Sequence, residues 1–529
     1  MRLLLLFIAS LFTITSIAQT FEHQWFLYQN QSSISNPTSK TAITRATPDN
    51  GVVYVTLEES VFDDGLGHFG TITISKVSAI NDGEWIVVLN SEVKVENVEV
   101  NNDGRIFIAG SYYDDITFSS GETLPYVGQG FQLSNMFLIC LESNGTLAWA
   151  KNLSANLDGM NDYINTGLAI GNNGQIHYAY TTYGDAYFVT LDANGDEVSS
   201  FEAGGIQVIG GLKCDSENNL YVSGGLFQGD VIFPSFAASA PFDYNAYVAK
   251  INADGSGGWI RFYEDITNQF VSLALNSNEQ PVIAYTLFVN IMVEEIEVTV
   301  PNFGEEFGLI QLDQNGDALW ATSLDDAISG GGMLTMLRNT IRTDDNGGVW
   351  LAGQVRGYLE FNGGLTIDAG NTTNYEGAIV RFDDQGVATT AAFLTGGGYD
   401  KIWSFDLIPT LEIYYATYCT EAYNPVPFEM PETEGNYRLL GKLILQDVSS
   451  INDEITSTFL EIYPTPSNDN VYLTSDCVIA RAEIFDLQGR KMLEQTFPPA
   501  RQQTISIETL PAGVYMVKAN SAVSRLVKN

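Results

Sequence analysis

The hydrophobic positions of this chain recur as short apolar runs, each following a turn rich in Asn, Asp or Gly. Each run ends in a small residue, and these residues are Thr56, Ala109, Ala179, Ser223, Ala284, Ala352 and Ala416. From position 56 to position 416 they recur with a mean period of 60 residues. A continuous apolar run bounded by turns is typical of a strand covered on both faces. The pattern predicts one such buried strand in each of seven repeats.

A second kind of segment alternates apolar and polar residues and ends in another acidic or Asn-containing turn. Clear copies occupy residues 139–145, 189–195, 249–255, 310–316 and 380–386, an irregular copy ends at residues 82–83, and a last copy runs through residues 439–443. Several of these turns are followed by a Trp, namely Trp85, Trp149, Trp259 and Trp320. Asn-Gly and Asp-Gly between apolar runs indicate hairpins, because Gly and Asn enter the left-handed backbone region at little cost. Each repeat therefore supplies two hairpins, or four strands.

Four-stranded sheets of this size cannot cover their own faces, so repeats of them pack side by side into a ring. The last repeat lacks its outer strand, whereas residues 23–28 form an N-terminal strand without a partner. Trp25 lies 26 residues before the first turn glycine, close to the spacing of 25 residues for Trp149 in its repeat. We therefore predict an all-β chain, a seven-bladed β-propeller closed by an N-terminal strand and followed by a small C-terminal β-sandwich.

The repeat unit resembles the β-propeller repeats of exported bacterial proteins. Residues 245–255, followed by Trp259, are the copy closest to that pattern. The resemblance covers about residues 20–447. It implies a fold and no particular activity.

The first residues have the pattern of a secretory signal peptide. An apolar run over residues 3–12 is followed by Ser16-Ile17-Ala18, small residues at the positions that a signal peptidase recognises. The run is shorter than the ~20 residues that span a bilayer core. We predict a signal peptide over residues 1–18 with cleavage between Ala18 and Gln19, a propeller over residues 19–447, and no membrane span.

A polar linker over residues 448–458 precedes a different pattern in residues 459–529. Four elements there, in order and flush with the last residue, closely resemble the type A C-terminal sorting domain of type IX secretion cargo. The residues that carry the resemblance are Tyr463, Pro464, Pro466, Asp486, Gly489, Arg490, Leu510, Pro511, Gly513, Tyr515 and Lys528. Thr465 departs from the family pattern, which commonly has Asn there. A small β-sandwich that merely packs on the propeller is the alternative interpretation.

The resemblance implies that the chain passes through the type IX translocon of the outer membrane. It also implies that a sortase-like peptidase removes residues 459–529 and that the remainder is attached to surface lipopolysaccharide or released. The host would then be a Gram-negative bacterium of the Bacteroidota, and the protein would be secreted or lie on the outer cell surface.

The acidic residues are concentrated before the C-terminal region. The chain has 64 acidic and 24 basic side chains, a net charge of −40, whereas residues 459–529 hold seven of each. Such a surface repels nucleic acid and anionic lipid, whose binding depends on Lys and Arg. We therefore expect neither as a partner. Solubility outside the cell explains the charge, and attraction of divalent cations is the alternative.

Residues with catalytic or metal-binding chemistry are scattered. His23, His68 and His177 lie in separate repeats, and the four cysteines have no metal-binding spacing. Acidic turns at residues 101–104 and 344–347 offer oxygens to Ca²⁺ but lack the ligand loop of a calcium hand. Turn chemistry explains them without a metal. We expect no cofactor, with Ca²⁺ as the open alternative.

Long connections follow the buried strand in several repeats, so we expect them on one rim of the ring, where binding residues concentrate. The aromatic residues of this candidate ligand rim are Tyr112, Tyr113, Tyr126, Phe131, Phe227, Phe242, Tyr244 and Tyr423. The first hypothesis is a non-catalytic binding or adhesion protein whose ligand is a glycan or a surface protein. The second is an extracellular polysaccharide hydrolase or lyase. Convergent carboxylates with raised pKa in a central funnel would favour the enzyme.

Overall fold

The computed structural model describes residues 19–30, 42–63, 68–127, 134–154, 164–182, 184–265, 270–300, 306–326, 333–369, 375–394, 401–408, 411–419, 437–447, 460–486, 490–519 and 522–529. The predicted signal peptide with Ala18 and the predicted linker lie outside these residues. Contacts divide the chain into one compact unit of Thr20–Gln446 and a second that contains Asp447–Asn529. Every element of the described residues is a β-strand, which confirms the predicted all-β class. None of these residues belongs to a helix that could cross a lipid bilayer.

Strand pairing divides the larger unit into four-stranded groups, which we call blades and number from the first inner strand. Blade 1 contains β2 (Ala42–Ala46), β3 (Val52–Asp63), β4 (His68–Val77) and the first half of β5 (Gly83–Val100). Blade 2 contains the second half of β5, β6 (Ile106–Tyr112), β9 (Asn135–Leu141) and β10 (Leu147–Asn152). Blade 3 contains β11 (Ile164–Ile170), β12 (Ile176–Thr182), β13 (Asp185–Leu191) and β14 (Glu197–Gly204).

The same order of strands continues through the rest of the unit. Blade 4 contains β15 (Gly211–Cys214), β16 (Leu220–Phe233), β17 (Phe236–Ile251) and β18 (Gly258–Asp265). Blade 5 contains β19 (Ser272–Leu275), β20 (Pro281–Leu287), β23 (Glu306–Leu312) and β24 (Ala318–Thr322). Blade 6 contains β26 (Met333–Thr343), β27 (Val349–Arg356), β30 (Glu376–Phe382) and β31 (Ala388–Leu394).

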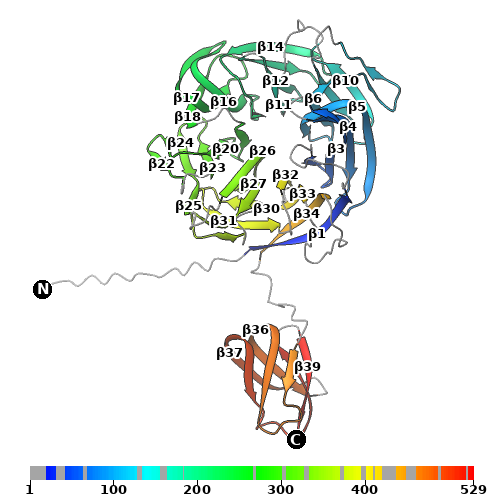
Figure 1. The fold of residues 1–529 in the computed structure, drawn as a ribbon, viewed down its shortest axis with the longest axis vertical. Coiled ribbons are helices and arrows are strands. Elements are labelled where there is room, and N and C mark those ends of the chain that lie inside the picture. The colour runs from blue at the N-terminus through cyan, green and yellow to red at the C-terminus, as the bar shows by residue number, and fades with distance from the viewer. Residues whose placement is uncertain are drawn as a thin grey trace, which may run out of the picture. The chain divides into compact units, whose positions relative to one another are not determined.

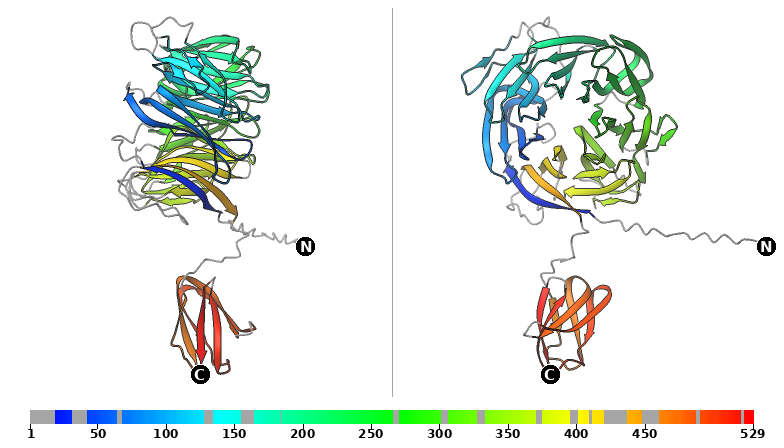
Figure 2. Two further views of the ribbon diagram at one scale, coloured as in Figure 1. Left: turned by 90° about the vertical axis from the view of Figure 1, so that its right-hand side faces the viewer. Right: turned by 180° about the vertical axis from the view of Figure 1, so that it is seen from behind.

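The last blade combines strands from both ends of the unit. Blade 7 contains β32 (Lys401–Ile408), β33 (Glu412–Cys419), β34 (Tyr437–Asp447) and, next to β34, the N-terminal strand β1 (Gln19–Asn30). The blades stand around a central axis with their first strands innermost, and β1 lies along the outside of β34 (Figures 1 and 2). The N-terminal strand therefore joins the two ends of the ring in one sheet, as its Trp spacing predicts.

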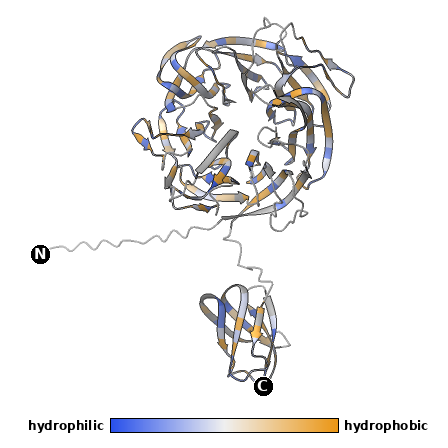
Figure 3. Ribbon diagram, viewed as in Figure 1, coloured by the Kyte–Doolittle hydropathy of each residue, from blue (hydrophilic) through white to orange (hydrophobic). Residues whose placement is uncertain are grey.

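The apolar cores lie between blades. The second and third strands are buried along their whole length in blade 2, since every residue of β6 and β9 is buried. One cluster joins Phe107, Met136 and Leu138 of blade 2 to Leu168, Ile176 and Tyr178 of blade 3. Apolar residues accordingly recur along strands all around the ring (Figure 3). Burial of apolar surface between neighbours is what stabilises each sheet.

The repeated Trp residues connect blades 1, 2, 4 and 5 to the blade that follows each of them. Trp259, on the outer strand of blade 4, donates its indole hydrogen to the carbonyl oxygen of Gln314 in a turn of blade 5, over 3.0 Å. The ring lies against Gly316, whose φ is 85° and where an added Cβ would come within 2.8 Å of the indole. The same bond to the next blade is made by Trp85, Trp149 and Trp320 to Ser143, Ala193 and Asp384. These Trp residues therefore serve packing between blades.

The smaller unit is a separate antiparallel β-structure with its own core. It contains β35 (Leu460–Tyr463), β36 (Asn470–Asp486), β37 (Lys491–Ser506), β38 (Gly513–Ala519) and β39 (Ala522–Lys528). The long strand β36 pairs with β35, β37 and β38. Its core includes Val471, Leu473, Ile484, Val517 and Leu526.

Candidate functional site

Charged side chains occupy equivalent positions on the innermost strands. In five blades, the residue two positions before the first residue of the following turn is charged. These residues are Arg45, Glu99, Lys213, Arg342 and Asp406, which we call the channel belt. The corresponding positions of blades 3 and 5 hold Ala169 and Ala274. One register of the inner strands thus carries three cations and two anions in a unit that is otherwise strongly acidic.

The channel belt contains two groups of ion pairs. Lys213 Nζ lies 3.0 Å from Glu99 Oε1, and Arg45 Nε lies 3.6 Å from Glu99 Oε2. Arg342 Nε lies 2.6 Å from Asp406 Oδ1, while Asp406 Oδ2 accepts a hydrogen bond from the Ala46 amide of blade 1. Blades 2 and 4 are not neighbours, so the contact between Glu99 and Lys213 crosses the inside of the ring.

The carboxylate of Glu99 does not have the protonation behaviour of a general acid. Burial alone would raise the pKa of Glu99, but the three surrounding cations hold that pKa below its ordinary value. A general acid needs a raised pKa so that it carries a proton near neutral pH. The criterion for an enzyme, convergent carboxylates with raised pKa, is therefore not met by Glu99. Its ion pairs instead connect blade 2 to blades 1 and 4.

We expect Glu99→Gln to lower the free energy of unfolding by about 2 kcal/mol, because buried Arg45 and half-buried Lys213 lose their counter-charge. Since the folded-state pKa of Glu99 is depressed, its contribution is present above its unfolded pKa and is lost as pH falls through the folded pKa. Urea unfolding at neutral pH and near pH 3 measures both effects, so the difference from wild type should shrink in acid. Exposed Glu202→Gln is the control, and an equal loss in both variants would contradict the prediction.

His177 and the acidic turn at residues 344–347 are engaged in local contacts, whereas the side chains of His23 and His68 lie outside the described residues. His177 is buried in β12, its Nδ1 lies 3.1 Å from Thr190 Oγ1, and burial lowers its pKa to about 4. Asp344 Oδ1 accepts hydrogen bonds from the amides of Asn346 and Gly348 in its own turn. Its other oxygen accepts from Trp350 and Arg381. Among the described residues, no group of acidic, His or Cys side chains is arranged to hold a metal ion.

The structure corrects the predicted ligand rim at Tyr112. This side chain is buried in the core of blade 2, and its hydroxyl donates a hydrogen bond to Pro125 O over 2.9 Å. Tyr113, Tyr126 and Phe242 are half-buried. Phe227 and Tyr244 are exposed and form an edge-to-face pair with ring centroids 5.5 Å apart. Phe131 and Tyr423 lie outside the described residues.

Burial at Tyr112 follows from what the long connections form. In blades 2, 4, 5 and 6 the connection between the second and third strands folds into a hairpin, which we call a brace. The braces are β7 (Ile116–Thr117) with β8 (Thr123–Leu124), the distal ends of β16 and β17, β21 (Ile291–Val293) with β22 (Ile296–Val298), and β28 (Tyr358–Phe361) with β29 (Thr366–Asp368). In blades 1 and 7 the connections include residues 64–67 and 420–436, outside the described residues.

Each brace lies between the outer strands of two consecutive blades. In blade 5, β21 packs against β18 of blade 4 and β22 against β24 of its own blade. In blade 6, β28 pairs with β25 (Leu324–Asp326), which follows the outer strand of blade 5, and Asn362 O accepts a hydrogen bond from Ala388 on β31. In blade 4, Ile232 pairs with Gly204 of blade 3. The braces therefore cover the outer part of the seam between blades.

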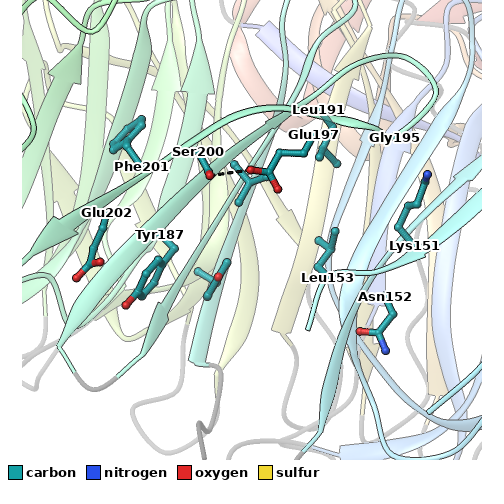
Figure 4. Close-up of a pocket in the computed structure, with 12 residues that line it drawn as sticks. Lys151, Asn152, Leu153, Tyr187, Leu191, Gly195, Glu197, Ser200, Phe201 and Glu202 are labelled. Atoms are coloured by element: carbon teal, nitrogen blue, oxygen red, sulfur yellow. Dashed lines mark hydrogen bonds between the residues drawn. The ribbon is translucent and has the colours of Figure 1, made fainter. Parts of the chain in front are cut away.

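The seam between blades 2 and 3 has no brace, because only residues 183–184 connect β12 to β13. A cleft of 470 Å³ lies there, which we call the open seam (Figure 4). One wall is formed by β10 and the residues after it, and the other by β13 and β14. The lining residues are Lys151, Asn152, Leu153, Tyr180, Tyr187, Val189, Leu191, Gly195, Glu197, Ser200, Phe201 and Glu202.

The third strand of blade 3 is also more exposed to solvent than the third strands of blades that have a brace. All seven residues of β9 in blade 2 and of β23 in blade 5 are buried. In β13 of blade 3, by contrast, Tyr187 and Val189 are half-exposed. Both face the open seam, as do Ser200 and Glu202 of β14, which pair with Val189 and Tyr187. Absence of a brace therefore leaves an apolar surface open to solvent.

The open seam combines an aromatic and aliphatic floor with acidic edges. The rings of Tyr180 and Tyr187 are stacked, with centroids 5.2 Å apart and an interplanar angle of 15°. Glu197 accepts a hydrogen bond from Ser200 over 2.7 Å (Figure 4), and Lys151 is paired with Asp196. Such a surface favours a ligand that has apolar faces and polar or basic groups. Sequence analysis missed this site, although the short connection after β12 was visible.

Contacts in the smaller unit bring the two ends of the sorting motif together. Thr465 Oγ1 accepts a hydrogen bond from the Val527 amide over 3.0 Å, and Ser467 pairs with Lys528. Tyr515 is buried and donates its hydroxyl hydrogen to Pro511 O over 2.7 Å. Tyr463, Pro464, Pro466 and Arg490 are exposed, Leu510 is buried and Gly513 and Lys528 are half-buried. Gly489 and the side chain of Asp486 lie outside the described residues.

Residues 461–529 match the family of secretion system C-terminal sorting domains. This confirms the resemblance that the sequence motifs indicated. The chain is therefore a type IX secretion cargo that reaches the cell surface or the extracellular space. No curated protein matches the chain.

Solved structures with a similar arrangement are distant in sequence. A protein of unknown function from Bacteroides caccae is 11% identical, covers 64% of this chain and 93% of its own, and has a TM-score of 0.31. The Dos1 propeller is 9% identical, with 80% and 95% covered and a TM-score of 0.38. Puromycin hydrolase is 10% identical, with 75% and 61% covered and a TM-score of 0.36. At this distance we take no activity from them.

Proposed function

We propose that this type IX cargo is a non-catalytic binding protein of the outer cell surface, and that it binds its ligand in the open seam. The observation that carries the proposal is the half-exposed floor of Tyr187 and Val189, in a position that braces cover in other blades. Exposed apolar surface of this kind marks binding sites on soluble proteins. A glycan and a protein of the cell surface are the two ligand classes we consider.

The channel belt gives no support to the alternative of a polysaccharide hydrolase or lyase. Glu99 is held ionised by cations, and Asp406 is engaged by Arg342 and by the Ala46 amide. A glycosidase needs one carboxyl group that donates a proton and another that stays ionised. The belt instead supplies rigidity, on which a binding surface depends.

We further propose the route by which the protein reaches its site of action. Residues 1–18 serve as the signal peptide, cleaved between Ala18 and Gln19, and residues 459–529 engage the type IX translocon and its sortase-like peptidase. Residues 19–447 then remain as the binding propeller, with residues 448–458 as a linker. Matching of the C-terminal residues to sorting domains supports this route.

A binding screen with two matched variants tests the proposal. The full chain is immobilised and probed with an oligosaccharide array and with a peptide library. Ser200→Arg fills the open seam, whereas Ser199→Arg adds the same side chain one residue away on the opposite face of β14, and both positions are exposed. We expect ligands whose binding is lost in Ser200→Arg and kept in Ser199→Arg. Absence of any ligand with this behaviour in either library would contradict the proposal.

A further inference from the structure

We infer that the ligand of the open seam is an extended strand or β-hairpin of a partner polypeptide with basic side chains. It would take the place that braces of this chain occupy in other seams. The inference rests on the proposed binding function and adds the class of partner.

The first support is the equivalence of position. The brace of blade 5 lies between the outer strands β18 and β24. The open seam lies between the corresponding outer strands β10 and β14 of blades 2 and 3. A strand-shaped segment therefore fits between two such outer strands in this fold.

The second support is that strands next to these seams pair through their backbones. Leu324, just after the outer strand of blade 5, pairs with Phe361 of the blade 6 brace. Gly204, at the end of β14, pairs with Ile232 of the blade 4 brace. An edge strand that accepts main-chain hydrogen bonds is a template for an added strand, whereas a glycan cannot extend a sheet in this way.

The third support is the match between side chains. The blade 5 brace buries Ile291, Val293 and Val298 and exposes Met292 and Glu297, which alternate with them. The floor of the open seam offers half-exposed Val189 and Tyr187 with buried Leu191 to such a row. Alternation of buried and exposed side chains is the property of a strand lying on an apolar surface.

The charge of the open seam determines which partner strands can bind there. Glu197 and Glu202 line the open seam, and Lys151, the one cation among its described lining residues, is already paired with Asp196. The brace of blade 5 carries Glu294, Glu295 and Glu297. A second copy of this chain would therefore present an acidic hairpin to an acidic cleft, which like-charge repulsion disfavours. A basic segment of another protein is complementary.

A peptide built on the blade 5 brace tests the inference. The probe has the sequence of residues 288–300 with Glu294→Lys, Glu295→Lys and Glu297→Lys, and its binding to the full chain is measured by fluorescence anisotropy. We expect Ser200→Arg to raise the Kd by about tenfold or more, while Ser199→Arg leaves it within about twofold. The unsubstituted acidic peptide should bind at least about tenfold more weakly than the lysine peptide.

If both variants unfold at the melting temperature of the wild type, a folding defect is excluded as the cause of lost binding. If both arginine variants bind the lysine peptide as wild type does, the inference is overturned. If the peptide fails to bind but an oligosaccharide binds in a manner sensitive to Ser200→Arg, the polypeptide partner is overturned and the proposed function stands. If neither ligand class binds, both fall.

Discussion

Removal of residues 459–529 is expected to leave a folded propeller that no longer reaches the cell surface. These residues contain the sorting match and have a core of their own, built around Val471, Ile484 and Leu526. Their loss therefore removes no residue of the blade cores. In a host with a type IX secretion system, we expect the truncated chain to accumulate in the periplasm, measured by cell fractionation and by protease accessibility on intact cells.

A shorter truncation distinguishes loss of the sorting signal from loss of a whole domain. Deleting residues 526–529 removes buried Leu526 and the strand end on which Ser467 pairs with Lys528. We expect export to fail as completely as with the longer deletion. Single exposed substitutions on β37, such as Lys491→Gln, serve as controls. Normal surface display of the chain without residues 459–529 would contradict the sorting function.

Deletion of residues 19–30 is expected to destabilise every blade at once. These residues form β1, the strand next to β34 in blade 7, and without them the ring has an uncovered sheet edge. The seam cores join neighbouring blades, so an opened ring should unfold cooperatively at a lower temperature. We expect a loss of roughly 5 kcal/mol, a large share of the total stability of a domain.

Adding the missing strand as a separate peptide gives the control for this deletion. A synthetic peptide of residues 19–30 should raise the melting temperature of the truncated chain in a concentration-dependent manner, since it binds only the folded state. Calorimetry measures both transitions. Melting of the truncated chain in two steps, with only one step shifted, would show that the effect of β1 is local.

Features of this fold that depend on residues close together in the sequence can be predicted from it, whereas features that depend on contacts with other segments cannot. The turn at Gly316 and the Trp259 that packs on it from the preceding blade are visible in the sequence, because the turn and the Trp each recur at a fixed place in the repeat. Tyr112 was misplaced for the opposite reason. Tyr112 is the last residue of the buried strand β6, and its side chain is covered because the connection that follows folds into the brace of β7 and β8.

The candidate site was less accessible to sequence analysis. Members of the channel belt, such as Glu99 and Lys213, are far apart in the sequence, and each alone looks like a solvated charge. Alignment of the inner strands by their turns would have placed them in one register. The open seam results from a short connection at residues 183–184. In the sequence, this site is therefore marked by the lack of a long connection in one repeat. A search for long connections does not find such a site.

The position of β1 also determines when the propeller ring can close during folding. Its partner β34 lies about 400 residues later in the chain. Contacts between such distant segments carry a large entropic cost and form slowly. Ring closure therefore waits until nearly the whole propeller has been made, and a nascent or partly translocated chain stays open. In a chain exported by the route we propose, late closure of this kind would keep the polypeptide unfolded enough to pass the first membrane.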